Sequence, residues 1–409
     1  MIYRVLLLLA IVVSPCSLSA QLSLREYIDM VREYSHALAS SEAATKAAAA
    51  DMQIARKQLL PSLDMGAEAN YEMRDGEHLD WLVRADITQP IYLGGGLQAR
   101  QRQAEMVLNA TRSNAEVVYR DVLYSAKVAY WQLSRAEIYY RAIERYCSIV
   151  GSLRQVVERR FMEGYTAKGD LLQLESRMSD AEYQLSRAEQ QRLQALHGFN
   201  LLRGADPMCD ARLSESILDT IYAPVRKDIN EVVCSHPDYV ASVAGREAAR
   251  YGVKVVEARY LPSVRLNLYG LMIPKGAQRD VGVDGGVGIS LTAPIFHFAE
   301  RREAVRSAES SLEQRAIVVD EIVDKISLDE SNSWTNILST QSRVRAVQRS
   351  LDIALENLEM STYSYSEGMA TILDVLQAQI SWLQIYSNAI SAQYDYAVAV
   401  AAYSYVVGE

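Results

Sequence analysis

Side chains that commonly carry catalysis or bind metals occur in the sequence but are not grouped. The five histidines are scattered, and no histidine–cysteine spacing typical of a metal site occurs. The sequence also has no nucleophile elbow. The run Gly94-Gly95-Gly96 lacks the Lys-Ser/Thr pair that a phosphate-binding loop needs. The residue types and spacings therefore predict no catalytic residue, no metal and no cofactor, and an enzyme is the least favoured class of function.

Two aspartates that follow short Glu-Gly turns offer charge instead of catalysis. The turns contain Glu163-Gly164 and Glu367-Gly368, followed by Asp170 and Asp374 respectively. Thr371 stands three residues before Asp374, a spacing that fits a capping box at the start of a helix. Ala167 occupies the matching position before Asp170 and has no side chain that caps. The sequence predicts a capping role for Asp374 and leaves a second role for its carboxylate open.

Residues 1–20 have the pattern of a secretory signal peptide. Arg4 precedes an apolar run, and small residues end the segment at Ala20. We expect cleavage after Ala20, so that the mature chain leaves the cytoplasm. Pro15 fits poorly with lipid attachment to Cys16. No later segment has about 18 consecutive apolar residues, which argues against a membrane-spanning helix.

Charge and cysteine content limit the partners and the covalent structure. The chain of 409 residues has a formal net charge of −9, which argues against nucleic acid as a partner. Cys147, Cys209 and Cys234 remain after removal of the signal. Cys209 and Cys234 flank one loop region and are candidates for a disulfide in an oxidising compartment, whereas three free thiols fit the sequence equally well.

Two predicted β-hairpins alternate between apolar and polar residues. In the first strand of the hairpin at 62–90, the apolar residues occupy every second position. They are Leu63, Met65, Ala67, Ala69, Tyr71 and Met73. A second hairpin at 263–294 shows the same period, which no helix produces. A soluble sheet alternates in this way too, but strands near the length of about 9–11 residues that crosses a membrane, with charges on the polar face, favour a barrel.

Short motifs that recur along the chain reveal an internal duplication. Leu60-Pro61-Ser62 is echoed by Leu261-Pro262-Ser263, and Gln89-Pro90-Ile91-Tyr92 is echoed by Ala293-Pro294-Ile295-Phe296. Only the first copy continues with Gly94-Gly95-Gly96, so only there do we expect a bend that needs glycine. Each copy is predicted to contain a helix, a hairpin, a long helix and a final helix. The predicted repeats span 21–205 and 228–409, with a linker at 206–227.

The stretches without proline predict long helices that pack as coiled coils. Apolar residues recur every seven positions in the first, at Ala115, Val122, Ala129, Ala136, Ile143, Val150 and Val157. A helix from 97 to 161 is about 100 Å long. Tyr139, Tyr140 and Tyr146 either line a wet seam or pack between helices. The fold class is therefore mainly α with a small β part.

Four strands per chain are too few to close a barrel. The smallest closed membrane barrels have about eight strands, and an open sheet edge in lipid leaves backbone groups unpaired. We therefore expect other copies of the chain to complete the barrel.

Together, in order and in duplicate, these motifs resemble the TolC-like outer-membrane efflux protein family over residues 21–409. The resemblance implies a homotrimer: a 12-stranded β-barrel in the outer membrane of a Gram-negative bacterium, with four strands per chain, continued by a periplasmic α-helical coiled-coil barrel. It implies a passive exit duct for drugs, small molecules or secreted proteins, as in type I secretion. The implied partners are outer-membrane lipid, a periplasmic adaptor (membrane fusion protein) and an inner-membrane pump such as a resistance-nodulation-division or ABC transporter.

The resemblance assigns the Glu-Gly turns to a periplasmic tip that closes the resting channel and contacts the adaptor. The residues concerned are Gly164, Asp170, Tyr365, Gly368, Thr371 and Asp374. Relatives tie the closed tip with an arginine at the position of Ala370, so that salt bridge is lost here, and Lys168 is a candidate replacement. In a trimer, three Asp374 carboxylates around one axis would attract cations. The alternative function is a structural periplasmic coiled-coil protein without a pore.

Overall fold

The structure, a computed structural model, describes residues 21–72, 78–219, 221–275 and 280–408. The predicted signal peptide and Cys16 lie outside these residues. The chain forms two compact units. Within the described residues, unit 1 comprises 21–39, 118–232 and 326–408, and unit 2 comprises 40–117 and 233–325. Each unit combines segments from both halves of the chain, so the units differ from the predicted repeats, which remain a statement about sequence.

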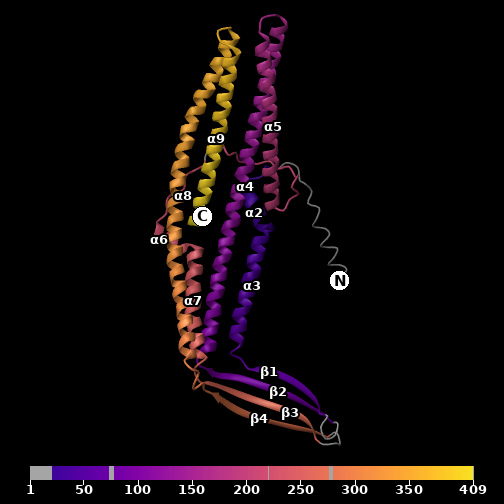
Figure 1. Ribbon diagram of the computed structural model, residues 1–409, viewed down its shortest axis with the longest axis vertical. Coiled ribbons are helices and arrows are strands. Elements are labelled where there is room, and N and C mark those ends of the chain that lie inside the picture. The colour runs from indigo at the N-terminus through magenta and orange to yellow at the C-terminus, as the bar shows by residue number, and fades with distance from the viewer. Residues whose placement is uncertain (1–20, 73–77, 220, 276–279, 409) are drawn as a thin grey trace. The chain divides into compact units, whose positions relative to one another are not determined.

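Two long helices of equal length correspond at an offset of 204 residues. They are α4 (Gly96–Met162) and α8 (Glu300–Ser366), each of 67 residues. Each turns back into a second helix, α5 (Lys168–Leu202) or α9 (Ile372–Val407), to form a helical hairpin (Figure 1). We call the connections turn 1 (residues 163–167) and turn 2 (residues 367–371).

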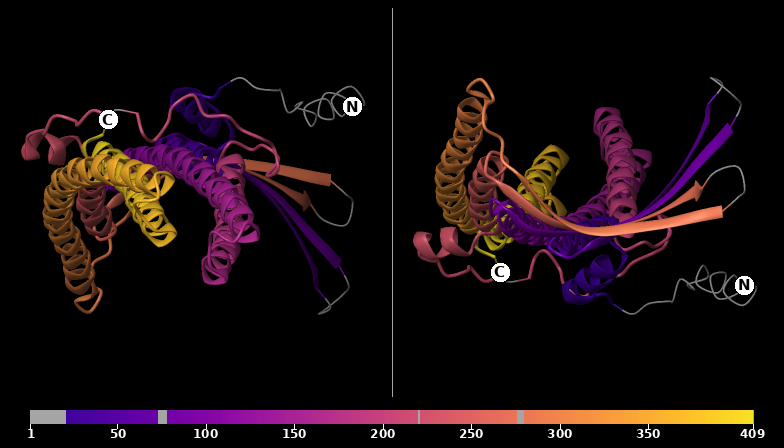
Figure 2. Two further views of the ribbon diagram at one scale, coloured as in Figure 1. Left: turned by 90° about the horizontal axis from the view of Figure 1, so that it is seen from above. Right: turned by 90° about the horizontal axis from the view of Figure 1, so that it is seen from below.

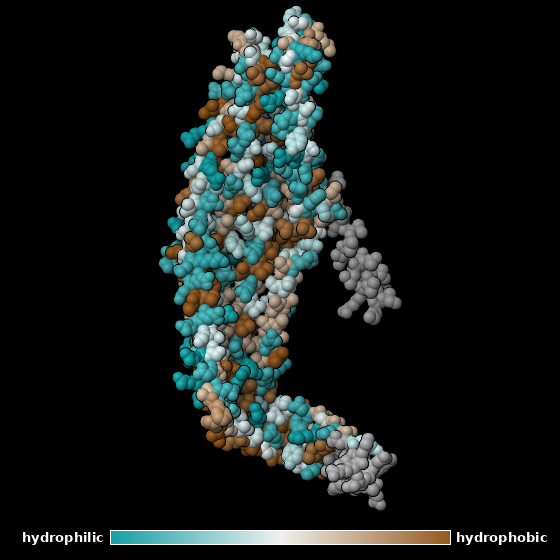
Figure 3. All heavy atoms as spheres, in the orientation of Figure 1, coloured by the Kyte–Doolittle hydropathy of each residue, from teal (hydrophilic) through white to brown (hydrophobic). Residues whose placement is uncertain are grey.

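The heptad pattern of α4 is confirmed by burial in unit 1. Ile143, Cys147 and Val150 are buried in one hydrophobic cluster with residues of α5 and α9. Tyr146 is buried in the same cluster, and Tyr139 and Tyr140 pack against it. These tyrosines therefore pack between helices. On the face shown in Figure 3, hydrophilic and hydrophobic residues are interspersed over the helices.

The helix that precedes each hairpin is interrupted, whereas the sequence predicted one continuous helix in each repeat. The first is divided into α2 (Leu24–Tyr34) and α3 (His36–Lys57), because the backbone of Ser35 is not helical. The second is divided into α6 (Ile229–Ser235) and α7 (Pro237–Ala258), because proline fits the first turn of a helix but not its interior. The helices α3 and α7 each have 22 residues and correspond at an offset of 201.

Unit 2 contains one antiparallel sheet with the strand order β1-β2-β3-β4. The strands are β1 (Ser62–Glu72), β2 (His78–Leu93), β3 (Ser263–Lys275) and β4 (Asp280–Thr292). Consecutive strands pair throughout, so β1 and β4 are the two edges, as Figure 2 shows from both ends. Both predicted hairpins are present. The predicted strand residues Met73 and Arg74 lie outside the described residues.

The segments that lead from β2 and β4 into the long helices both contain a bend with positive φ. We call them the first exit (residues 90–96) and the second exit (residues 294–300). Gly94 and Gly95 have φ of +59° and +78°, and Phe298 and Ala299 have φ of +40° and +66°. The first exit has the glycine bend that the sequence predicted, and the second exit bends without glycine, since two other residues adopt the left-handed conformation there.

Cys147 and Cys234 are free thiols, so the disulfide between Cys209 and Cys234 does not form. Among the described residues, no helix has a stretch long and apolar enough to cross a membrane. Within the same residues, no group of acidic, histidine and cysteine side chains has the arrangement of a metal site.

Candidate functional site

Turn 1 and turn 2 end their preceding helices in the same way. Gly164 has φ of +80° and Gly368 has φ of +74°, a conformation that glycine adopts without strain. The amide of Tyr165 donates to the carbonyl of Arg160 at 2.8 Å, and the amide of Met369 donates to that of Ser364 at 2.8 Å. These hydrogen bonds span five residues, as in the Schellman motif that stops a helix. The glycines of the Glu-Gly motif are thus explained by the geometry of the helix ends.

The start of α9 contains the capping box that the sequence predicted. The carboxylate of Asp374 accepts hydrogen bonds from the amide of Thr371 at 2.8 Å and from its hydroxyl at 2.7 Å. The amide of Asp374 in turn donates to the Thr371 hydroxyl at 3.4 Å. These bonds, led by that of the hydroxyl, lower the pKa of the Asp374 carboxyl. Asp374 is exposed, and it therefore presents a fixed negative charge beside turn 2.

Asp170 occupies the equivalent position in α5 without an equivalent cap. Ala167 is the N-cap residue and makes no side-chain hydrogen bond. Asp170 is half-buried in the first turn of α5, where a negative charge is favoured by the helix dipole. Within the described part of the chain, neither Asp170 nor Lys168 forms an ion pair, so Lys168 does not replace the missing arginine inside one subunit.

A small hydrophobic cluster joins the two turns inside unit 1. Val157 of α4, Leu174 of α5 and both Ile372 and Leu376 of α9 are buried together, and Tyr365 of α8 packs against them. The four helix ends are thereby held by one apolar contact region. This cluster places Tyr365 beside both turns, and its role in a gate stays a prediction.

Arg160 is a site residue that the sequence analysis missed. Its guanidinium carbon lies 5.2 Å from the centroid of the Tyr365 ring, in a cation–π contact between α4 and α8. Relatives were expected to use an arginine of turn 2, at the position of Ala370. The arginine here comes from the other helical hairpin, and its only sequence signal is a basic residue in the last turn of α4. Motif comparison gives no reason to pair it with Tyr365.

The sheet has one apolar face and one charged face. The strand register places Leu63 opposite Ile87, Val83 opposite Met272 and Met272 opposite Val283, so one face is continuous across all four strands. Large side chains on this face are exposed. They are Leu63, Met65, Ile87, Met272, Val283, Val287, Ile289 and Leu291.

The opposite face of the sheet is polar and carries paired charges. Arg84 and Asp86 form a salt bridge with 2.6 Å between Nε and Oδ2. Asn267 on β3 donates to the hydroxyl of Ser290 on β4 at 3.1 Å. The apolar face on the other side of the sheet is exposed over all four strands, and such a face marks a contact with lipid or with another protein.

Comparisons with known proteins agree with these features. The family model described as "Outer membrane efflux protein" matches residues 27–205 and 229–409. The chain belongs to this family. Membership confirms the predicted TolC-like family, and with it an outer-membrane efflux channel whose helical part lies in the periplasm of a Gram-negative bacterium.

Individual relatives of this outer membrane efflux protein are distant but cover most of it. Protein CyaE of Bordetella pertussis is 23% identical over 383 residues, which cover 88% of this chain and 79% of CyaE. Outer membrane efflux protein BepC of Brucella suis is 24% identical and covers 78% and 70%. The solved structure of the outer-membrane channel OprN matches with a TM-score of 0.84 at 17% identity, over 94% of this chain and 89% of that one. This likeness confirms the mainly helical fold with a small sheet.

Proposed function

We propose that this protein is the passive exit duct of a tripartite export system, built as a homotrimer. Three copies contribute four strands each to a 12-stranded barrel in outer-membrane lipid. A periplasmic adaptor connects the helical part to an inner-membrane pump of the resistance-nodulation-division or ABC class. Drugs, small molecules or secreted proteins pass through the duct, and the pump supplies the energy.

The amphipathic sheet is the observation that carries this proposal. Its exposed apolar face suits hydrocarbon, and the charges of Arg84 and Asp86 on the other face suit a water-filled lumen. The backbone amides and carbonyls along the edge strands β1 and β4 need hydrogen-bond partners, because an unpaired group in lipid costs several kcal/mol. Pairing β4 of one copy with β1 of the next removes every edge. Tyr92, at the end of the first hairpin, suits the aromatic girdle where a barrel meets the membrane interface.

The two turns are proposed as the periplasmic gate and the adaptor contact. The residues assigned to this role are Gly164, Asp170, Tyr365, Gly368, Thr371 and Asp374. The exposed and ionised Asp374 supports it, since three such carboxylates around a trimer axis form a ring that attracts cations and impedes anions. We assign the contact between Arg160 and Tyr365 to the same gate, where it holds the two helical hairpins together in the closed state.

Ion selectivity in planar bilayers tests the gate. Asp374→Asn removes the charge, and we expect it to reduce the preference of the channel for cations. Thr371→Ala is the matched control, because it removes the hydroxyl of the cap but keeps the carboxylate, and cation preference should be retained. Unchanged selectivity in Asp374→Asn would leave Asp374 with the capping role alone.

Cell fractionation and a deletion strain test the export function. We expect the protein to stay in outer membranes through salt and alkaline washes, and we expect a deletion strain to accumulate drugs or to lose secreted proteins. Release by the washes would favour the alternative of a structural periplasmic coiled-coil protein without a pore. The set of compounds or proteins retained by the deletion strain then identifies the cargo.

A further inference from the structure

The two exits both contain two consecutive residues with positive φ but differ in what covers them. Both follow a Pro-Ile-aromatic sequence and lead into a helix of 67 residues. Gly94 and Phe298 are equivalent at the offset of 204, and both have positive φ. A bulky residue with positive φ is strained, so the bend at Phe298 is kept at a conformational cost.

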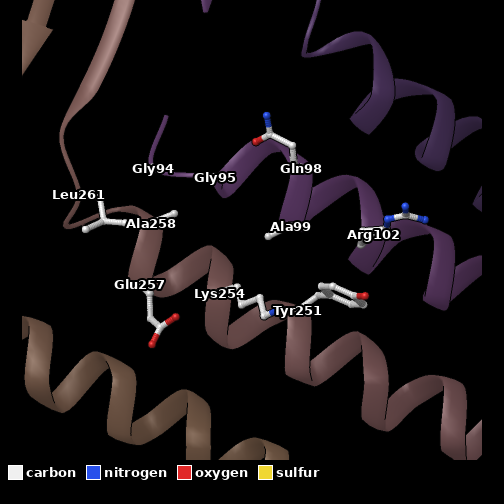
Figure 4. Close-up of a pocket in the computed structure, with 10 residues that line it drawn as sticks. All are labelled: Gly94, Gly95, Gln98, Ala99, Arg102, Tyr251, Lys254, Glu257, Ala258 and Leu261. Atoms are coloured by element: carbon white, nitrogen blue, oxygen red, sulfur yellow. The ribbon is translucent and has the colours of Figure 1, made fainter. Parts of the chain in front are cut away.

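The first exit is filled by the end of α7 from the same chain. A Cβ atom added to Gly94 would lie 2.7 Å from Cβ of Leu261 and 2.8 Å from the carbonyl oxygen of Ala258. Figure 4 shows Ala258 and Leu261 beside Gly94. Since β2 pairs with β3, the segment that leads into β3 lies directly against this bend. Glycine is required here because the neighbouring backbone leaves no space for a side chain.

The second exit exposes an apolar cluster that nothing in the described chain covers. Ile295 is 94% exposed, Phe296 is 70% exposed and Phe298 is 88% exposed. The rings of Phe296 and Phe298 pack edge to face with centroids 4.6 Å apart. On the α8 side, Tyr260 donates to Glu300 at 3.0 Å. The bend is therefore held from one side, and its apolar side remains open.

The internal correspondence of the chain identifies what fits this open side. At the offset of 201, the end of α3 corresponds to the end of α7, and Leu60 corresponds to Leu261. Leu60 is 60% exposed, whereas its counterpart lies against the first exit. The end of α3 leads into β1, and the second exit follows β4. These are opposite edges of one sheet, so the equivalent contact forms between two copies of the chain.

We propose that the cluster of Ile295, Phe296 and Phe298 is the docking surface for the α3–β1 junction (residues 57–62) of a second copy of this chain. The inference rests on the trimer of the proposed function and names the residues at its subunit boundary. Phe298 stands at the position of Gly94 and carries a side chain, so the contact with Leu60 of the neighbour is made by a ring and not by closely packed backbone. The contact stabilises the strained bend.

Charges at the helix termini do not decide this arrangement. The last turn of α3 carries Arg56 and Lys57, and the first turn of α8 carries Glu300 and Glu303. Arg301 and Arg302 lie in the same turn of α8, so the two acidic charges are offset by two basic ones. The apolar match between Leu60 and Phe298 therefore decides the docking.

Cross-linking in the full chain tests the docking surface. We expect Leu60→Cys combined with Phe298→Cys to give covalent dimers and trimers in outer membranes treated with a short bifunctional maleimide. The wild type, which has an exposed Cys234, gives the background. The pair Leu60→Cys and Leu201→Cys is the matched control, because Leu201 is exposed but lies outside the proposed surface.

The outcomes separate this inference from the proposed function. A trimer by native mass spectrometry without the cross-link between residues 60 and 298 would overturn the docking surface, assign the cluster to lipid and leave the export duct intact. Absence of any trimer would overturn both. As a second measurement, Phe298→Leu should keep the heat resistance of the trimer in detergent, and Phe298→Asp should lower it. Equal heat resistance of the two variants would contradict the apolar contact.

Discussion

Alanine at two adjacent glycines should affect stability very differently, because only one of them faces a neighbour. Gly94→Ala and Gly95→Ala both place a side chain at positive φ, which costs about 1–2 kcal/mol. The new Cβ at Gly94 would also overlap Leu261 and Ala258, whereas at Gly95 nothing lies within 4 Å. Overpacking adds about 1–3 kcal/mol, so we expect a total loss near 2–5 kcal/mol for Gly94→Ala.

Guanidinium unfolding of the detergent-solubilised chain, followed by far-ultraviolet circular dichroism, measures the difference between the two variants. Gly245→Ala, inside α7 and with open space around its added Cβ, is a further control that should be neutral or slightly stabilising. Equal losses for Gly94→Ala and Gly95→Ala would refute the close contact at the first exit.

Three further predictions concern unit 1. Thr371→Ala should reduce the free energy of unfolding by about 1 kcal/mol at neutral pH, measured by urea titration. Folding lowers the pKa of the Asp374 carboxyl, so its ionised form stabilises the protein above the pKa of the unfolded state. This stabilisation is lost as the pH falls through the pKa of the folded state. The difference in stability between wild type and Thr371→Ala should therefore shrink in acid below about pH 4. Tyr365→Phe should keep the contact with Arg160, and Tyr365→Leu should lose about 0.5–1 kcal/mol of coupling to Arg160→Gln in a double-mutant cycle. Glu330 is only 1% exposed and accepts two hydrogen bonds from Arg226, each at 2.9 Å. Glu330→Gln should therefore reduce the free energy of unfolding by about 2 kcal/mol, measured by thermal unfolding. No loss of stability would contradict a structural role for this pair.

The regular elements were predictable because each has a periodic signal. Alternation with period two located both hairpins, since one face of the sheet is apolar along its whole length. The seven-residue period of α4 located the residues that are buried in unit 1, such as Ile143 and Val150. The Thr371–Asp374 pair was predictable as a cap because a capping box depends only on local spacing.

Features that depend on contacts between distant segments were not predictable. Arg160 meets Tyr365 only because two helical hairpins lie side by side in unit 1, and no local pattern joins these residues. The bend at Phe298 has no glycine, so propensity argued against it, although the equivalence with Gly94 was visible in the sequence. The break at Ser35 likewise has no proline to signal it, whereas Pro237 is a local signal for the second break.

The number of chains that share one barrel is the most direct test of the account. Native mass spectrometry of the mature protein, released from outer membranes in a mild detergent, measures it. We expect one species with three times the mass of the mature chain. A stable single chain, with β1 and β4 covered by its own helices, would contradict the shared barrel and the export duct built on it.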